Sequence, residues 1–277
     1  MIKTIESAHN DTVKLAHKLQ KKKTRRERGL FVAEGFDLLE AAVRVEEYPL
    51  LLLVREDVVG RIPAELRQAA QEDELDIGVC SEEVLARASG LGGAADVVAV
   101  HELVEWSLGD LAVDEGIVVY LHGVGDPGNV GTIVRGVVAF GAAGVACSPG
   151  TADPYGPKAL RAGMGAQFLT RVVVDVSAED MAAKLRAGSS RGEAVPTVIV
   201  ADPRGEETAS SLALVRGGVV LVLGSERGGL PDLGAGARRV AIAQARFDSL
   251  NVAMAATVLL YELSRGRLGK GAGALLA

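Results

Sequence analysis

Residues 116–148, GIVVYLHGVGDPGNVGTIVRGVVAFGAAGVACS, decide the fold of this chain. The run 116–123 is apolar without polar alternation, which predicts a strand buried on both faces. A helix over 129–140 and a second strand over 144–148 follow it. Continuous rather than alternating apolar strands, separated by a helix, indicate an α/β fold with a parallel sheet covered on both sides.

The same alternation continues downstream of this segment. The sequence predicts strands at 170–176, 197–201, 218–224 and 239–242, and helices at 158–164, 178–187 and 249–265. Ser249 is the expected N-cap of the last helix, because its hydroxyl can accept from the first free N–H groups. Residues 266–277 lack a polar pattern and are expected to be a loose tail.

Upstream, a smaller α/β pattern precedes the parallel sheet. Strands are expected at 30–34, 50–54, 76–80 and 96–100, and helices at 35–45, 63–71, 81–88 and from Asp11 or Thr12 to about residue 20. The acidic segment 101–115 has little pattern and is expected to connect two domains. The predicted division is 1–105, a linker at 106–116, and 117–277.

Composition excludes several classes of protein. The 277 residues are 48% hydrophobic, yet the longest apolar stretches are strand-length and too short to span a bilayer. The two cysteines, Cys80 and Cys147, make neither a disulfide framework nor a metal site, so a reducing cytoplasmic setting is expected. The net charge of −6 argues against a uniformly basic nucleic-acid binder, so any RNA contact must be local.

A basic segment near the start supplies such a local contact. Residues 11–28 contain eight lysines and arginines and only two acids, Asp11 and Glu27. Phosphate contacts from such a segment give sequence-independent affinity. The alternative, a solvated helix end followed by a basic loop, is equally favoured by the sequence alone. The predicted RNA-binding residues are Lys21, Lys22, Lys23, Arg25 and Arg26.

One motif suggests a different cofactor and is set aside. Residues 123–128, GVGDPG, fit the glycine pattern of dinucleotide-binding folds between a strand and a helix. Pro127 is unusual there, and Ser148 and Pro149 stand near the end of the next strand, where that pattern requires an acid. The glycines are better explained by a tight loop that places Asn129 and Arg135.

Three further segments carry the chemistry: Asn129-Val-Gly-Thr-Ile-Val-Arg135, Gly224-Ser-Glu-Arg-Gly228 and Ser249-Leu-Asn-Val-Ala-Met-Ala-Ala256. Asn129 and Arg135 are less than two turns apart on one helix, so both can serve one substrate. Arg135 offers a fixed cationic fork suited to phosphate. Glycines at 224 and 228 let the backbone approach a ligand closely.

In their order and spacing these segments resemble the three signature motifs of the SpoU (TrmH-like) branch of the SPOUT RNA methyltransferases. The resemblance is strong over 117–265, and Phe31, Glu34 and Gly35 resemble the substrate-binding domain of ribosomal RNA members. It implies a small N-terminal α/β (L30e-like) substrate-binding domain, then a SPOUT domain whose parallel sheet ends in a deep trefoil knot. It further implies a homodimer through the catalytic domain.

The implied reaction is S-adenosylmethionine-dependent methyl transfer to a ribose 2′-hydroxyl, with ribosomal RNA as the expected substrate and neither metal nor membrane involved. Alternatives are a transfer RNA substrate, or a non-catalytic RNA-binding or assembly protein that keeps the fold. By resemblance the catalytic residues are Asn129, Arg135, Glu226, Ser249 and Asn251, and the cofactor-binding residues are Ala201, Gly224, Ser225, Ile242 and Leu250. Because guanidinium is effectively always protonated, Arg135 is expected to stabilise an oxyanion rather than to act as a base.

Overall fold

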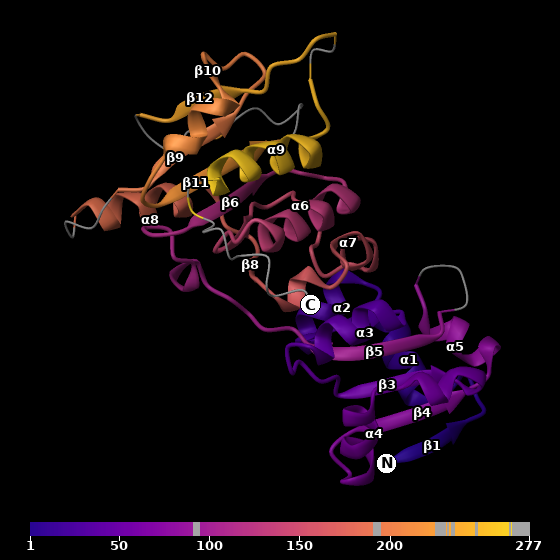
Figure 1. Ribbon diagram of the computed structural model, residues 1–277. Helices are drawn as coiled ribbons and strands as arrows, with labels where there is room; N and C mark the ends of the chain where they lie inside the picture. The colour runs from indigo at the N-terminus through magenta and orange to yellow at the C-terminus, as the bar shows by residue number, and fades with distance from the viewer. Residues whose placement is uncertain are drawn as a thin grey trace. The chain divides into compact units, whose positions relative to one another are not determined.

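The computed structural model describes residues 1–90, 95–190, 195–224, 231, 233, 236–246, 249–265 and 267 (Figure 1). The chain divides into two compact units. Unit 1 comprises Met1–Val104 and Asp153–Leu169, and unit 2 comprises Glu105–Ala152 and Thr170–Ala277. The segment Asp153–Leu169 thus groups with the N-terminal residues, although its neighbours on both sides in the chain belong to unit 2. The predicted domain boundaries at 105 and 117 stay a prediction.

Unit 1 is built on a five-stranded mixed sheet in the order β1-β4-β3-β5-β2. Its strands are β1 (Ile2–Ile5), β2 (Leu30–Glu34), β3 (Leu51–Arg55), β4 (Asp76–Cys80) and β5 (Val97–Glu102). The pairs β1–β4 and β3–β4 are parallel, whereas β5 runs antiparallel to both β3 and β2. The strand β2 therefore forms one edge of the sheet.

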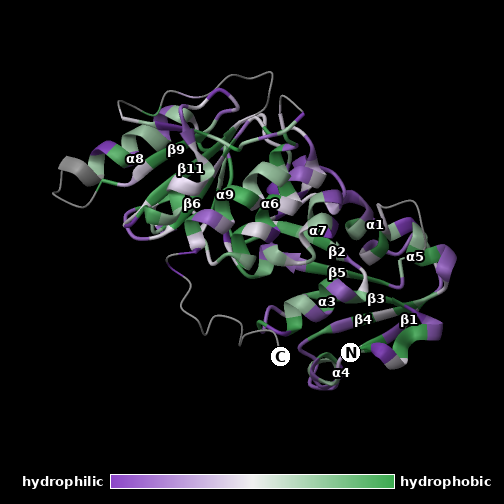
Figure 2. Ribbon diagram, turned by 45° about the horizontal axis from the view of Figure 1, so that its top comes forward, coloured by the Kyte–Doolittle hydropathy of each residue, from purple (hydrophilic) through white to green (hydrophobic). Residues whose placement is uncertain are grey.

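Helices cover both faces of this sheet. They are α1 (Asp11–Lys18), α2 (Lys22–Arg28), α3 (Phe36–Val43), α4 (Ala64–Gln71) and α5 (Glu82–Ala88), with a 3₁₀ turn at Glu56–Arg61. Leu53 packs in one apolar cluster with residues of α1 and α5, and the adjacent Leu52 packs in another with residues of α3 and α4. Side chains alternate between the faces of a strand, so each face has its own core. The strands of this unit are accordingly hydrophobic along most of their length (Figure 2).

Two elements of unit 1 were not expected, and one cap differs. The sequence pattern predicted neither β1 nor the basic helix α2. The cap of α1 is Asn10, whose side chain accepts from Thr12 N, rather than Asp11 or Thr12. Ser81 caps α5, because its hydroxyl accepts from Val84 N.

Unit 2 contains the parallel sheet, in the order β10-β12-β9-β11-β6-β7-β8. Its strands are β6 (Ile117–His122), β7 (Gly144–Cys147), β8 (Arg171–Val173), β9 (Thr197–Ala201), β10 (Glu207–Thr208), β11 (Val219–Gly224) and β12 (Arg238–Ala241). Every neighbouring pair is parallel, which confirms the predicted sheet. The trefoil knot implied by the resemblance stays a prediction.

Three α-helices of unit 2 complete the layers among the described residues: α6 (Pro127–Ala139), α8 (Ala178–Ser190) and α9 (Val252–Ser264). Val118 and Tyr120 of β6 share an apolar cluster with Met181 and Leu185 of α8. Val119, which alternates with them, is also fully buried, so β6 is covered on both faces. Short 3₁₀ turns stand at Leu108–Asp110 and Ala209–Leu214.

The segment Asp153–Leu169 of unit 1 carries a helix of its own, α7 (Pro157–Gly163), and a 3₁₀ turn at Ala166–Phe168. No helix in the described parts of the chain is both long enough and apolar enough to span a bilayer.

Candidate active site

The carboxyl ends of four neighbouring strands meet at one edge of the unit 2 sheet. Gly224, at the end of β11, pairs in register with His122, at the end of β6. Ala201 ends β9, and Ile242 directly follows β12 on the far side of β9. In parallel α/β sheets, ligands bind outside this edge. The structure therefore brings three of the predicted cofactor residues, Ala201, Gly224 and Ile242, to the edge where a ligand is expected.

The glycine-rich loop after β6 provides the N-cap and the first residue of the helix α6. Asp126 is the N-cap of α6 and accepts from Asn129 N at 2.7 Å, and Pro127 takes the first helical position. Proline suits that position because it has no N–H to leave unpaired. Gly123 N donates to Ser148 Oγ at 2.9 Å, which ties the start of the loop to the end of β7. The loop thus fixes where Asn129 stands, as expected.

The start of α6 and the start of α9 are joined by a side-chain hydrogen bond. Asn251 Nδ2 donates to Asn129 Oδ1 at 3.0 Å. Asn251 Oδ1 accepts from the backbone of Ala253 at 2.9 Å and of Met254 at 3.4 Å. Asn251 is therefore the N-cap of α9, and the expectation that Ser249 would cap this helix was wrong. Because both ends of the Asn251 amide are engaged, its orientation is fixed.

Arg135 is exposed on α6, where the neighbouring Ile133 and Val134 turn into the core. Within the described residues its guanidinium has no hydrogen bond or ion pair, so five donors remain for a ligand. Six residues along a helix correspond to about 9 Å of rise and a rotation of about 120° from Asn129. The structure does not bring Arg135 into contact with Asn129 or Asn251. A substrate that touches both ends of this motif must reach across nearly two turns of α6.

The strand ends offer unsatisfied polar atoms to a ligand. His122 Nδ1 and Gln244 Oε1 are buried without a hydrogen-bond partner among the described residues. Gln244 stands two residues after Ile242, and His122 ends the strand beside Gly224. Buried polar atoms are normally paired, so unpaired ones at a sheet edge fit a ligand with its own donors and acceptors.

The remaining predicted site residues are placed as follows. Ala201, Gly224, Ile242 and Leu250 are half-buried, whereas Ser249 and Asn251 are exposed. Glu226 and Ser225 lie outside the described residues. Half-buried apolar side chains beside backbone polar groups suit an adenine ring, so S-adenosylmethionine fits the described part of this edge. Across the same described residues, no group of three or more metal-ligating side chains comes together.

Three residues of this edge were not predicted from the sequence: His122, Gln244 and Asp126. His122 and Gln244 gave no signal in the sequence, because only the fold shows that His122 Nδ1 and Gln244 Oε1 are buried without a partner among the described residues. Asp126 could have been found from sequence, since an Asp directly before Pro is a typical helix start.

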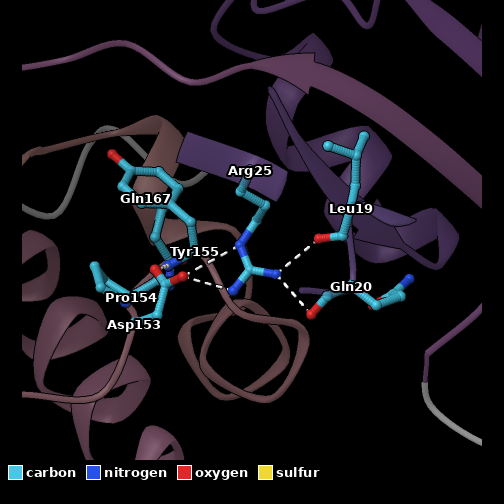
Figure 3. Close-up of polar contacts among 7 residues, drawn as sticks. All are labelled: Leu19, Gln20, Arg25, Asp153, Pro154, Tyr155 and Gln167. Carbon is cyan, nitrogen blue, oxygen red and sulfur yellow. Dashed lines mark hydrogen bonds and ion pairs between the residues drawn. The ribbon is translucent and has the colours of Figure 1, made fainter. Parts of the chain in front are cut away.

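Of the predicted RNA-binding residues, Arg25 is not available to contact RNA. Its side chain is only 4% exposed, and it donates to Asp153 Oδ2 from Nη2 at 2.5 Å and from Nε at 3.2 Å (Figure 3). Nη1 donates to the carbonyl oxygens of Leu19 at 2.7 Å and Gln20 at 2.9 Å. The guanidinium is therefore used within the protein and is not available to phosphate. The other four, Lys21, Lys22, Lys23 and Arg26, are exposed.

Comparison with known proteins agrees with this geometry. The SpoU rRNA Methylase family matches residues 116–261, and the MRM3-like substrate binding domain matches residues 10–99. The 23S rRNA (guanosine(2553)-2′-O)-methyltransferase RlmP of Bacillus subtilis is 32% identical over 172 residues, which cover 62% of this chain and 65% of that protein. A Synechocystis protein named as a tRNA/rRNA methyltransferase is 30% identical over 95% of this chain and 94% of its own.

A solved structure supports the same assignment. The AdoMet-bound rRNA methyltransferase from Sinorhizobium meliloti superposes with a TM-score of 0.81 and 30% identity, covering 97% of this chain and 99% of that one. The predicted substrate-binding domain and the predicted methyltransferase domain are both confirmed. With more than half of its residues matched by one family and a relative aligned over nearly its whole length, this chain belongs to the SpoU rRNA methylase family.

Proposed function

We propose that this protein transfers a methyl group from S-adenosylmethionine to a ribose 2′-hydroxyl of ribosomal RNA, which releases S-adenosylhomocysteine and the hydroxyl proton. The observation that carries the proposal is the Asn251–Asn129 hydrogen bond, which joins two of the three motifs beside the ligand-binding edge of the sheet. The names of RlmP and of the Sinorhizobium meliloti structure, both rRNA methyltransferases, support the same reaction.

The cofactor would be held at the strand ends. The backbone at Gly224 would approach it closely, and the apolar faces of Ile242 and Leu250 would flank its adenine beside Ala201. We assign Ser225 to the same site. S-adenosylmethionine supplies an electrophilic methyl group on a sulfonium centre. The protein's part is to hold the acceptor ribose in line with that methyl group and to exclude competing water.

Arg135 would act on the acceptor. Its exposed guanidinium can hold the phosphate next to the reacting ribose and stabilise the negative charge that develops on the 2′-oxygen. A guanidinium remains protonated at any working pH, so it acts as a cation and not as a proton acceptor. Asn129 and Asn251 keep the starts of α6 and α9 fixed, and we assign Ser249 and Glu226 to the same site.

We also propose a homodimer that pairs through α9. Met254, Val258 and Tyr261 of α9 are large hydrophobic residues, and they are 61%, 36% and 52% exposed. They stand four and three residues apart, which puts them on one side of the helix. A large apolar stripe on the surface favours a protein partner. Light scattering should give twice the chain mass of 28.7 kDa, and Met254→Glu with Tyr261→Glu should give the single mass.

The setting is proposed to be the reducing cytoplasm, which the absence of a disulfide at Cys80 and Cys147 supports.

Two measurements test the proposed function. Calorimetric titration with S-adenosylmethionine, repeated in the presence of RNA, should show one binding site per chain. Maps of 2′-O-methylation in ribosomal and transfer RNA, from cells with and without the protein, should differ at a ribosomal position. A difference only in transfer RNA would change the substrate. No difference together with no cofactor binding would favour a non-catalytic RNA-binding role.

A further inference from the structure

The helix α7 is held inside unit 1 by three separate anchors. The first is the buried ion pair between Arg25 of α2 and Asp153, four residues before α7 begins. Asp153 is 17% exposed and also accepts from Tyr155 N at 3.0 Å through its other oxygen. One carboxylate thus joins the turn that starts α7 to the guanidinium of α2.

The second anchor is aromatic. The ring of Tyr155 lies 5.2 Å from that of Phe31 on β2, and Phe168 lies 5.7 Å from Phe31 and 4.8 Å from His101. These rings are mostly buried and pack at tilted angles, which aromatic pairs prefer. The segment is therefore fixed to the edge strand of the unit 1 sheet at both of its ends.

The third anchor lies within the segment. Buried Gln167 donates from Nε2 to the carbonyl oxygens of Pro154 at 3.0 Å and Ala159 at 3.2 Å (Figure 3 shows Gln167 beside Asp153 and Pro154). This closes the loop around α7, so the helix cannot turn independently of its two ends. Its orientation in unit 1 is fixed.

With α7 fixed in this way, two of its cations point outward. Lys158 and Arg161 are exposed, three residues apart, and their neighbours Ala159, Leu160 and Gly163 face the core. Neither cation has a hydrogen bond or ion pair within the described residues. The only acid in residues 153–169 is Asp153, whose charge is already compensated by Arg25.

The helix α2 lies next to α7 in unit 1, as both ribbon views show (Figures 1 and 2). A Cβ placed on Gly156, the cap of α7, would stand 3.6 Å from Arg25 Nη2. Residues 21–28 hold six cations and one acid, Glu27, which stands in an exposed pair with Lys23. Apart from the buried Arg25–Asp153 pair, residues 21–28 and 153–169 therefore place seven exposed cations against one acid, Glu27, in a chain whose net charge is −6.

We propose that α2 and α7 form one RNA-binding surface, in which Lys158 and Arg161 contact backbone phosphates together with the exposed cations of α2. The Arg25–Asp153 pair positions the two helices relative to each other. RNA is the expected partner because the inference rests on the proposed function, and a phosphate backbone is the polyanion that such a surface binds. The surface draws on both the N-terminal domain and a segment inside the methylase match.

The test measures RNA affinity against salt concentration, using the full-length protein and a fluorescein-labelled RNA hairpin with a single-stranded loop. Each phosphate contact that is removed should lower the slope of log affinity against log salt by about one. Arg161→Gln should lower it by about one, and Lys158→Gln with Arg161→Gln by about two. Affinity for S-adenosylmethionine should stay unchanged in both variants, because neither residue stands at the strand ends of unit 2.

Arg67→Gln is the matched control. Arg67 is an exposed helical arginine of the same unit, but it belongs to α4, which connects β3 and β4 away from the β2 edge. Its removal should leave the slope unchanged. A slope that falls equally in Arg67→Gln and Arg161→Gln would mean that only net charge matters, and would overturn the proposed surface.

Asp153→Asn distinguishes the positioning of α7 by the Arg25–Asp153 pair from the effect of the negative charge of Asp153 on RNA binding. The substitution removes an acid from the basic surface, so electrostatics alone predicts tighter RNA binding. Loss of the pair that fixes α7 predicts weaker binding, which is the expected result. Tighter binding would overturn the positioning role of the pair.

Different results would contradict the RNA-binding surface and the proposed function. An unchanged slope in the double variant, with RNA binding and methyl transfer intact in the unmodified protein, would overturn the surface alone. Absence of RNA binding or of methyl transfer in the unmodified protein would overturn both.

Discussion

Asn251 donates a hydrogen bond to Asn129 at 3.0 Å, across 122 residues of chain. Each asparagine stands at the start of a helix, Asn129 in the first turn of α6 and Asn251 at the cap of α9. The bond therefore fixes two helix starts against each other at the carboxyl edge of the parallel sheet. The first and third motifs, far apart in the sequence, act at one place.

Asn251→Ser separates the two roles of this residue, which caps α9 and donates a hydrogen bond to Asn129. A serine can still cap α9 but cannot reach Asn129 with an amide donor, so the free energy of unfolding should change by only a few tenths of a kcal/mol. Methyl transfer should fall, because the starts of α6 and α9 are no longer joined. Asn251→Ala should lose the cap as well and cost about 1 kcal/mol of stability. Equal transfer by the serine variant and the unmodified protein would show that the link has no catalytic part.

Arg135→Ala should remove most methyl transfer and leave affinity for S-adenosylmethionine nearly intact. An interaction formed with the reacting ribose and phosphate appears in turnover more than in cofactor binding, and its loss costs about two to three orders of magnitude in rate. Single-turnover rates with saturating cofactor measure this directly. Arg135→Lys should recover only part of the rate, because a point charge cannot make the two-pronged contact. Turnover close to that of the unmodified protein in Arg135→Ala would remove Arg135 from the mechanism.

Arg25→Ala should destabilise unit 1 by about 3 kcal/mol, because it leaves the part-buried Asp153 carboxylate and two backbone carbonyls without their donor. Arg28→Ala is the matched control, since Arg28 is an exposed cation on the same helix. Its substitution should change the free energy of unfolding by less than about 0.5 kcal/mol. Urea unfolding, followed by the fluorescence of a probe in unit 1, compares the two. Equal stabilities would mean that the pair contributes nothing net.

His101 predicts a specific loss of stability in acid. His101 lies on β5, and its ring packs against those of Phe31 and Phe168. Burial lowers the pKa of His101 from 6.5 to about 4, so the folded protein keeps it neutral. The unfolded chain takes up the proton more readily than the folded protein does. The free energy of unfolding is therefore undiminished by His101 above pH 6.5 and decreases as the pH falls toward 4. The loss amounts to roughly 3 kcal/mol.

His101→Phe has no proton to take up and should reduce this pH dependence. Urea unfolding of both proteins at pH 7 and at pH 4.5 measures it. If the two proteins lose the same stability between those values, titration of His101 does not contribute to acid sensitivity.

The sequence predicted most of this fold because its elements are set by local pattern. The strands β2, β4 and β9 have the predicted bounds, and the other predicted strands agree within a few residues. The two-residue strand β10 was not predicted. The edge strand β1 was missed because it has four residues, three of them exposed, and so carries little apolar signal. The helix α2 was missed because its sequence, KKTRRER, has no apolar face, and its one buried residue is the charged Arg25.

The site residues that the family resemblance names could be predicted from the sequence. Side chains whose role depends on contacts between distant parts of the chain could not. The expected positions of Asn129, Gly224 and Ile242 follow from strand and helix ends. The fate of Arg25 depends on Asp153, which is 128 residues away, and no local pattern carries that information. The cap of α9 was assigned to Ser249 rather than to Asn251 because both are good caps and stand two residues apart.

The most direct test of the account is methyl transfer with purified components. The protein is incubated with ribosomal RNA and S-adenosylmethionine carrying a labelled methyl group, and the RNA is then digested to nucleosides. The account predicts one labelled 2′-O-methylated nucleoside, which disappears with Arg135→Ala while cofactor binding remains. A label found on a base instead of the ribose, or no label despite bound cofactor and bound RNA, would contradict it.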